Sequence, residues 1–211
     1  MVSSVRLQEM PDLTESVTTT KQKPVPFFLY LALLFLLICI NALGAKFAVF
    51  SFELAPGVSS VYIIVAVMIV FGLWFGLYGA IAAYFGCFIG AGMLSGIPPD
   101  VNIYWSLADF WEVLIPLAAF RAFGCDPGLK NWRDAGVLLV FGIILNNVAG
   151  ATWGAVGLAL GGEIPWSEVV QVCYGWLSVN LIVCIVLLPL MLFFITPYLR
   201  DHELYVRRYW H

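Results

Sequence analysis

The chain alternates between long apolar runs and short polar connections. Each of six runs is close to the roughly 20 apolar residues that a helix needs to cross a bilayer. They cover about 26–45, 59–75, 78–95, 102–123, 134–160 and 168–196. No strand-like alternation or long linker separates them. The pattern predicts an all-α integral membrane fold, a six-helix transmembrane bundle over residues 26–198, with polar tails at 1–25 and 199–211.

Composition supports this fold class. The chain is 62% hydrophobic and 11% charged, with a mean hydropathy of +0.95, whereas a soluble domain is about half apolar and a quarter charged. The net charge of −3 is small, and no basic patch suggests a nucleic-acid partner. The first apolar run begins only near Phe27, too late for a secretory signal, so we expect a short disordered cytoplasmic tail before it.

The distribution of lysine and arginine predicts the orientation of the bundle. Short cytoplasmic loops carry an excess of basic residues. With six spans and the N-terminus inside, only Lys46 falls in an outer loop. The other nine basic residues fall inside: Arg6, Lys21, Lys23, Arg121, Lys130, Arg133, Arg200, Arg207 and Arg208. The sequence therefore predicts a multi-pass protein of the plasma membrane with both termini cytoplasmic.

Two carboxylates interrupt the fourth apolar run, in WSLADFWEVLIPLAAFR. Asp109 and Glu112 are three residues apart, so they share one helix face. A charge inside a membrane is costly and usually faces the bundle interior or water. Helix rise places Asp109 and Glu112 roughly 10–15 Å below the outer end of their span. We therefore expect both side chains to face inward.

Polar and aromatic residues of two other spans fall at a similar depth. Asn146 and Asn147 lie on the fifth span, and Trp176 and Asn180 share a face of the sixth. The predicted ligand-binding set is Trp105, Asp109, Glu112, Asn146, Asn147, Trp153, Trp176 and Asn180. One hypothesis is a small-molecule pocket open to the outside, in which polar groups orient the ligand and aromatics stack on it. The alternatives are a self-satisfied network of amides and carboxylates that holds the bundle together, and a proton or ion pathway.

Two GxxxG pairs, Gly86 with Gly90 and Gly150 with Gly154, allow close helix approach. They indicate either packing within the chain or a docking face for another subunit, and the motif does not separate the two. No catalytic constellation competes with the binding hypothesis. Both histidines, His202 and His211, lie in the C-terminal tail, so no HExxH or Ser–His arrangement is available. We therefore expect no enzyme activity and no cofactor. The five cysteines form no CxxC pair, and we expect neither a disulfide nor a metal site.

Several segments resemble a known family. GVSSVYIIVAVMIVFGLWFGLYGAIAAYFGCFIGAGMLSG is similar to the second and third spans of prokaryotic membrane-associated sensor input domains. WSLADFWEVLIPLAAFR resembles their next span, through Ser106, Glu112 and Arg121. The stretch from Asn131 to Leu190 resembles the following pair, with Arg133 and Asp134 entering, Gly154 within, Gly162 and Trp166 in the loop, then Trp176 and Pro189.

The nearest sub-type is the vitamin-uptake-like sensor, which is similar to the S subunits of energy-coupling factor transporters. This resemblance covers about residues 56–189 and implies a six-helix bundle that binds a small molecule from outside. In sensors an output domain follows, and none follows LRDHELYVRRYWH here. We therefore expect a sensor module that acts with a signalling partner or within a longer protein. The alternatives are an S-type subunit that delivers a vitamin-like solute with a transporter partner, and a purely structural bundle.

Overall fold

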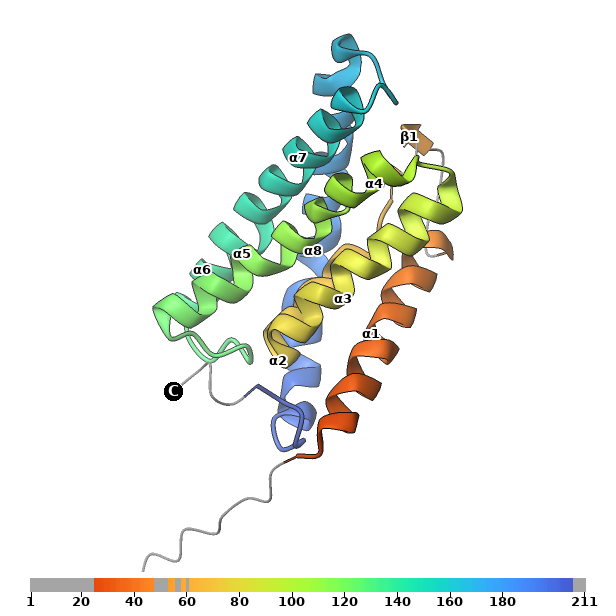
Figure 1. Cartoon of the computed structure of the whole chain (residues 1–211). Helices are drawn as coiled ribbons and strands as arrows, with labels where there is room; N and C mark the ends of the chain where they lie inside the picture. The colour runs from red at the N-terminus through yellow and green to blue at the C-terminus, as the bar shows by residue number, and fades with distance from the viewer. Residues whose placement is uncertain (1–24, 48–52, 56–57, 60, 207–211) are drawn as a thin grey trace, which may run out of the picture.

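Helices make up most of the chain that the computed structural model describes, which is residues 25–47, 53–55, 58–59 and 61–206. Most of the predicted tails, residues 1–24 and 207–211, lie outside the described residues. The principal helices are α1 (Phe27–Phe47), α2 (Ile64–Phe75), α3 (Leu77–Cys87), α4 (Pro99–Trp105), α5 (Leu107–Phe123), α6 (Trp132–Val137), α7 (Asn146–Leu160) and α8 (Val169–Leu199). Two short strands, β1 (Glu53–Ala55) and β2 (Val58–Ser59), form an antiparallel hairpin at one end of the bundle (Figure 1).

Five of the six predicted spans are confirmed as helical segments long and apolar enough to cross a membrane. They are Phe27–Phe47, Leu77–Ser95, Pro99–Phe123, Trp132–Leu160 and Trp166–Leu199. Four of them combine more than one helical element. A π-helical turn (Phe88–Gly92) and a 3₁₀ turn (Met93–Ser95) extend α3, α4 leads into α5 at Ser106, and a π-helical stretch (Leu138–Leu145) joins α6 to α7. A 3₁₀ turn (Trp166–Glu168) precedes α8.

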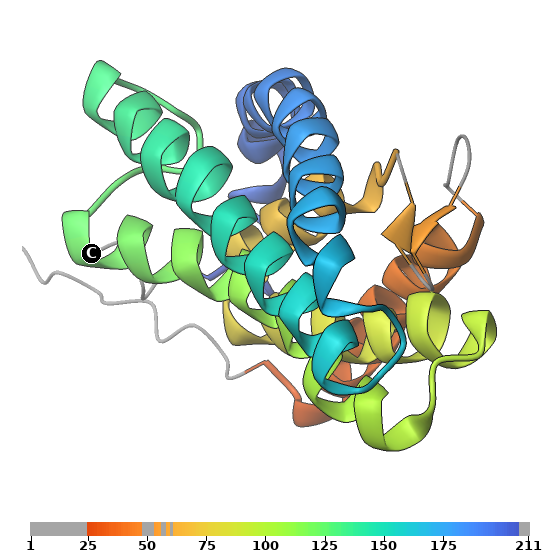
Figure 2. The ribbon, with the colours of Figure 1, turned by 90° about the horizontal axis from the view of Figure 1, so that it is seen from above.

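The second predicted span, 59–75, is wrong in extent. Its helix, α2, has only 12 residues, about 18 Å of rise, and begins at Ile64. Ten of those residues are buried, because α2 packs against α1, α3, α5 and α8 in the middle of the bundle (Figures 1 and 2). A helix that is apolar all round belongs in an interior. Here the interior is that of the protein, so the apolar run indicates a short buried helix and not a long lipid-facing one.

The outer surface of the bundle is apolar. Phe27 is 71% exposed, Val170 78% and Ile182 65%, and many large hydrophobic side chains on α1 and α8 are exposed in the same way. A soluble monomer rarely leaves such extensive apolar surface in water. Together with the five long apolar helices, this surface is that of a membrane protein.

Glycines bring the helices into backbone contact. A Cβ added at Gly86 would collide with Asn41 of α1, and one at Gly90 with Ala42 and Ala45. A Cβ at Gly79 would strike the backbone of Phe71 and Gly72 on α2. The Gly86–Gly90 pair therefore serves packing of α3 within the chain, the first of the two predicted roles.

The first and last long helices meet at one end of the bundle. The start of α1, the α5–α6 connection and the end of α8 lie together, opposite the β1–β2 hairpin and α4 (Figure 1). This end of the bundle carries four basic residues at or between helix ends, namely Arg121, Lys130, Arg133 and Arg200. Lys46 lies at the opposite end, where its ammonium donates to the Leu94 carbonyl oxygen at 2.7 Å.

Candidate functional site

The two carboxylates of α5 face the interior, as expected from their position in an apolar run. Asp109 is 2% exposed and Glu112 0%. The surrounding elements are α2, α3 and α7, which pack on α5, and α8, which lies next to α7. We call the buried group formed by Tyr62, Asp109, Glu112, Asn146, Asn147, Trp176 and Asn180 the interior polar cluster.

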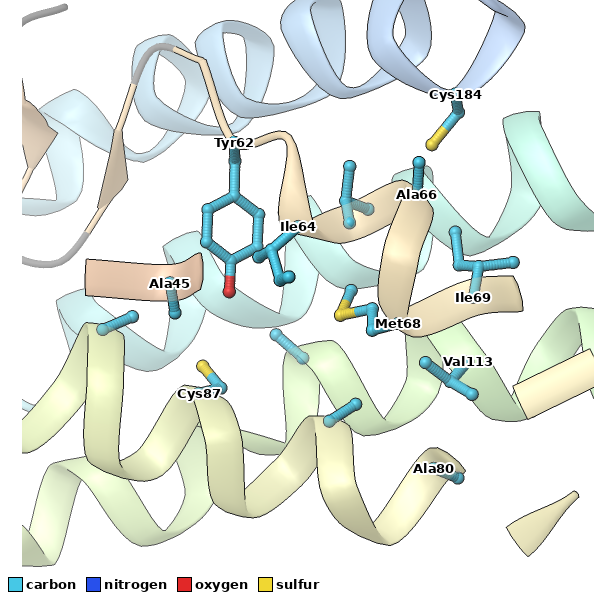
Figure 3. Close-up of a cluster of buried hydrophobic side chains, with 14 of the residues drawn as sticks. Ala45, Tyr62, Ile64, Ala66, Met68, Ile69, Ala80, Cys87, Val113 and Cys184 are labelled. Carbon is cyan, nitrogen blue, oxygen red and sulfur yellow. The ribbon is translucent and has the colours of Figure 1, made fainter. Parts of the chain in front are cut away.

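Asp109 has a defined partner, Tyr62, that the sequence did not reveal. Tyr62 lies between the hairpin and α2, and its hydroxyl donates to Asp109 Oδ2 at 2.9 Å. The Cys87 thiol of α3 also lies beside this carboxylate. Figure 3 shows the Tyr62 hydroxyl and the Cys87 sulfur directed toward the same space between α2 and α3. The sequence gives little indication of this contact, because Tyr62 is a single tyrosine directly before a run of aliphatic residues.

Glu112 has no such partner. Neither carboxylate oxygen accepts a hydrogen bond from the described residues. The Trp176 indole N–H and the Asn180 amide of α8 lie beside it, yet both are also without a hydrogen bond of ordinary geometry. Gly150 of α7 lies so close that a Cβ there would collide with the carboxylate. Glu112 therefore occupies a tight site, bounded by α7 and α8, whose hydrogen bonds are incomplete.

The two asparagines bond mainly to the backbone. Asn146 Nδ2 donates to the carbonyl oxygen of Glu112 at 3.2 Å, not to its carboxylate. Asn147 Nδ2 donates to the Ile143 carbonyl oxygen at 2.8 Å and lies 3.6 Å from Cys184 Sγ. Asn147 Oδ1 has no partner in the described chain. The expected network of amides donating to carboxylates is thus wrong for Asn146.

Two asparagine amides, those of Asn147 and Asn102, donate to carbonyl oxygens in π-helical segments. The π-helical stretch before α7 contains Ile143, whose carbonyl accepts from Asn147. In the same way, Asn102 Nδ2 donates at 2.8 Å to the carbonyl oxygen of Phe88, the first residue of the π-helical turn after α3. A π-helical segment changes the usual i to i−4 pairing and is frequent at functional sites. These side-chain amides therefore donate to backbone carbonyl oxygens at places where the backbone departs from α-helical geometry.

The predicted aromatic residues divide into two groups. Trp105 and Trp176 are buried and meet edge to face, with ring centroids 6.2 Å apart, and a Cβ at Gly154 would collide with the Trp176 ring. Trp153 lies elsewhere. It is 41% exposed, donates from Nε1 to the Tyr104 carbonyl oxygen at 2.7 Å and packs on Trp111. The structure thus brings seven of the eight predicted residues into the buried region and leaves Trp153 at the bundle surface.

Within the described residues, no group of three or more histidines, cysteines, aspartates or glutamates could hold a metal ion. All five cysteines lie in this part of the chain and are free thiols.

Comparison with known proteins identifies no relative: no family model, no curated protein and no solved structure matches this chain.

Proposed function

We propose that this chain is a membrane module that binds a small molecule in the interior polar cluster and serves as a sensor input domain for a signalling partner. One observation supports the proposal above the others. Among the described residues, the buried Glu112 carboxylate has two oxygens without hydrogen-bond partners, beside the unpartnered N–H groups of Trp176 and Asn180. We propose no reaction for this site, because binding alone accounts for its residues.

The argument for a ligand is the cost of leaving these groups unpaired. Buried polar groups in proteins are nearly always hydrogen-bonded, and each unsatisfied one costs about 1–3 kcal/mol. A network that served only packing would be expected to satisfy its own members. Glu112, Asn147, Trp176 and Asn180 come from three helices and all retain free hydrogen-bonding capacity. A polar ligand that completes these bonds would recover that free energy.

The long helix α8 supports the sensor role. Trp176 and Asn180 lie on its first half, and the same unbroken helix runs on to Leu199. Near its end, Thr196 Oγ1 accepts a hydrogen bond of 3.0 Å from Trp74 Nε1, and Arg200 pairs with Asp126. A ligand that shifts Trp176 would therefore move a helix whose other end is held to the α5–α6 connection. We place that end in the cytoplasm because it carries most of the basic residues.

The S-type transporter subunit, which uses the same site, is the alternative. It differs in the fate of the ligand, since a sensor retains the compound outside and an uptake subunit delivers it into the cell. Uptake of the identified compound by cells that express the chain and its neighbouring genes distinguishes the two. Accumulation that depends on Glu112 would favour transport, and a changed partner output without accumulation would favour sensing.

The proposal is tested by identifying what co-purifies with the protein. Wild type, Glu112→Gln and Glu168→Gln are purified in mild detergent, and bound small molecules are identified by mass spectrometry. Glu168 is an exposed glutamate just before α8, so Glu168→Gln is the matched control. We expect one compound to be retained by wild type and the control and lost from Glu112→Gln, with its melting temperature unchanged or raised. If no protein retains a compound and Glu112→Gln alone melts early, the cluster is structural and the proposal fails.

A further inference from the structure

The interior polar cluster contains two carboxyl groups and no basic residue. Its two carboxyl groups lie beside Tyr62, Cys87, Trp176 and Asn180, none of which carries a positive charge. The described basic side chains are placed elsewhere. Lys46 binds Leu94, Lys130 and Arg200 pair with Asp126, and Arg133 donates to the Phe123 carbonyl. Arg121 is nine residues further along α5 than Glu112, about 13 Å of helix rise.

The unpaired acceptors have a number and type that match one chemical group. Within the described chain, the buried side-chain acceptors in the cluster without a partner are Glu112 Oε1, Glu112 Oε2 and Asn147 Oδ1. A primary ammonium group has three N–H donors and a positive charge. Its donors equal the unpaired acceptors in number, and its charge would balance an ionised Glu112 carboxylate. Charge-assisted hydrogen bonds of this kind are about twice as strong as neutral ones.

The aromatic residues favour the same group. The Trp105 and Trp176 rings meet in the buried region, and indole faces attract organic cations. A bare metal ion needs a complete shell of oxygen ligands, and the described cluster offers only three unpaired acceptors. An anion would lie next to two carboxyl groups and be repelled by any negative charge they carry.

We infer that the ligand carries a primary ammonium group, which binds the Glu112 carboxylate and Asn147 Oδ1 beside the Trp176 ring. The inference rests on the proposed function and specifies the class of ligand. The Asp109 carboxyl accepts a hydrogen bond from Tyr62 within the protein. The Glu112 carboxyl is the one that the ligand would bind.

Three probes that share a ring and differ in charge test this inference: benzylammonium, benzyl alcohol and benzoate. Each is titrated by calorimetry, in an amine-free buffer, into the protein in phosphatidylcholine nanodiscs, with empty nanodiscs as the blank. We expect benzylammonium to bind about tenfold or more tightly than the other two, since one charge-assisted hydrogen bond contributes at least that ratio. Glu112→Gln should lose this preference, and Glu168→Gln should keep it.

The outcomes separate this inference from the proposed function. Equal or tighter binding of benzyl alcohol or benzoate overturns the ammonium class and leaves a binding module. Stabilisation by sodium or potassium chloride without benzylammonium binding overturns it in favour of an inorganic cation. Failure of all probes, together with no co-purified compound, overturns both proposals. The charge preference is measured in wild type, so it stands even if Glu112→Gln does not fold. In that case Trp176→Phe locates the site, and we expect weaker benzylammonium binding from it.

Discussion

The two carboxyl groups of α5 differ in what surrounds them, although they are one helical turn apart. Asp109 accepts a hydrogen bond from Tyr62, and Glu112 lies among groups that are themselves unpaired. The first arrangement is that of a structural contact, because both partners come from the chain and both are buried. The second leaves hydrogen-bonding capacity that a ligand can use. We therefore expect Asp109 to matter for stability and Glu112 for binding.

Tyr62→Phe should destabilise the protein by about 1–3 kcal/mol, because it removes the hydroxyl donor and leaves a buried Asp109 oxygen with one partner fewer. Chemical denaturation in nanodiscs measures the free energy of unfolding. Tyr198→Phe is the matched control, since Tyr198 is 86% exposed on α8. Equal stabilities of the two variants would show that the Tyr62–Asp109 hydrogen bond contributes nothing to the fold.

At the scale of elements, α7 is positioned by its small residues. Gly150 fits against the Glu112 carboxylate on α5 and Gly154 against the Trp176 ring on α8. The second GxxxG pair therefore holds α7 against the two helices that carry the cluster. This is the within-chain role, and it sets how closely the polar groups approach one another.

Gly150→Ala and Gly154→Ala should each destabilise the protein by about 1–3 kcal/mol, because a methyl group at either position overpacks a tight contact. Each should also weaken retention of the co-purified compound. Gly136→Ala in α6 is the control, since nothing lies within 4 Å of its added Cβ. Alanine there should be neutral or up to about 1 kcal/mol stabilising. Denaturation of the three variants in nanodiscs provides the comparison, and a loss at Gly136 equal to that at Gly150 would contradict the packing account.

The sequence predicted most helices and the placement of the cluster because those features depend on local pattern. Apolar run length marks a helix, and the three-residue spacing of Asp109 and Glu112 puts them on one face. The 12-residue length of α2 was not predictable, because periodicity does not distinguish a buried central helix from a membrane span. Tyr62 was missed because its partner Asp109 is 47 residues away. Trp153 was misplaced because depth along α7 says nothing about which face the ring occupies.

At the scale of the whole molecule, the end where α1 begins and α8 ends is held by contacts between distant segments. Asp126, in the α5–α6 connection, pairs with Lys130 at 2.9 Å and with Arg200 beyond α8. Tyr205 is buried, and the Val206 N–H donates to the Trp74 carbonyl oxygen at 2.9 Å. The segment after α8 thus packs on α2 and on the α5–α6 connection.

The pH dependence of this end follows from Asp126. Burial alone would raise the pKa of its carboxyl, but hydrogen bonds from Lys130, the Gly128 N–H and Arg200 outweigh that effect and hold the pKa below its usual 3.8. A carboxyl with a lowered pKa stabilises the fold above the unfolded-state value and loses that contribution as the pH falls through the folded value. Asp126→Asn should therefore cost about 1 kcal/mol or less at pH 7 and nothing at pH 2. Denaturation of both proteins at the two pH values checks this, and a difference that persisted at pH 2 would contradict it.

The orientation of the whole bundle in the membrane can be tested by cysteine labelling. The segment 61–75 returns the chain across the bundle, so the start of α1 and the end of α8 lie at one end (Figure 1), with Arg121, Lys130, Arg133 and Arg200. Positive residues favour the cytoplasmic side. An impermeant maleimide added to intact cells should therefore label Asp100→Cys, at the opposite end. Lys130→Cys, whose native side chain is 61% exposed, should react only after permeabilisation. Labelling of the unmutated chain is measured in parallel and subtracted, because its native cysteines can also react. Labelling of position 130 in intact cells would reverse the orientation, and the site would then be reached from the cytoplasm.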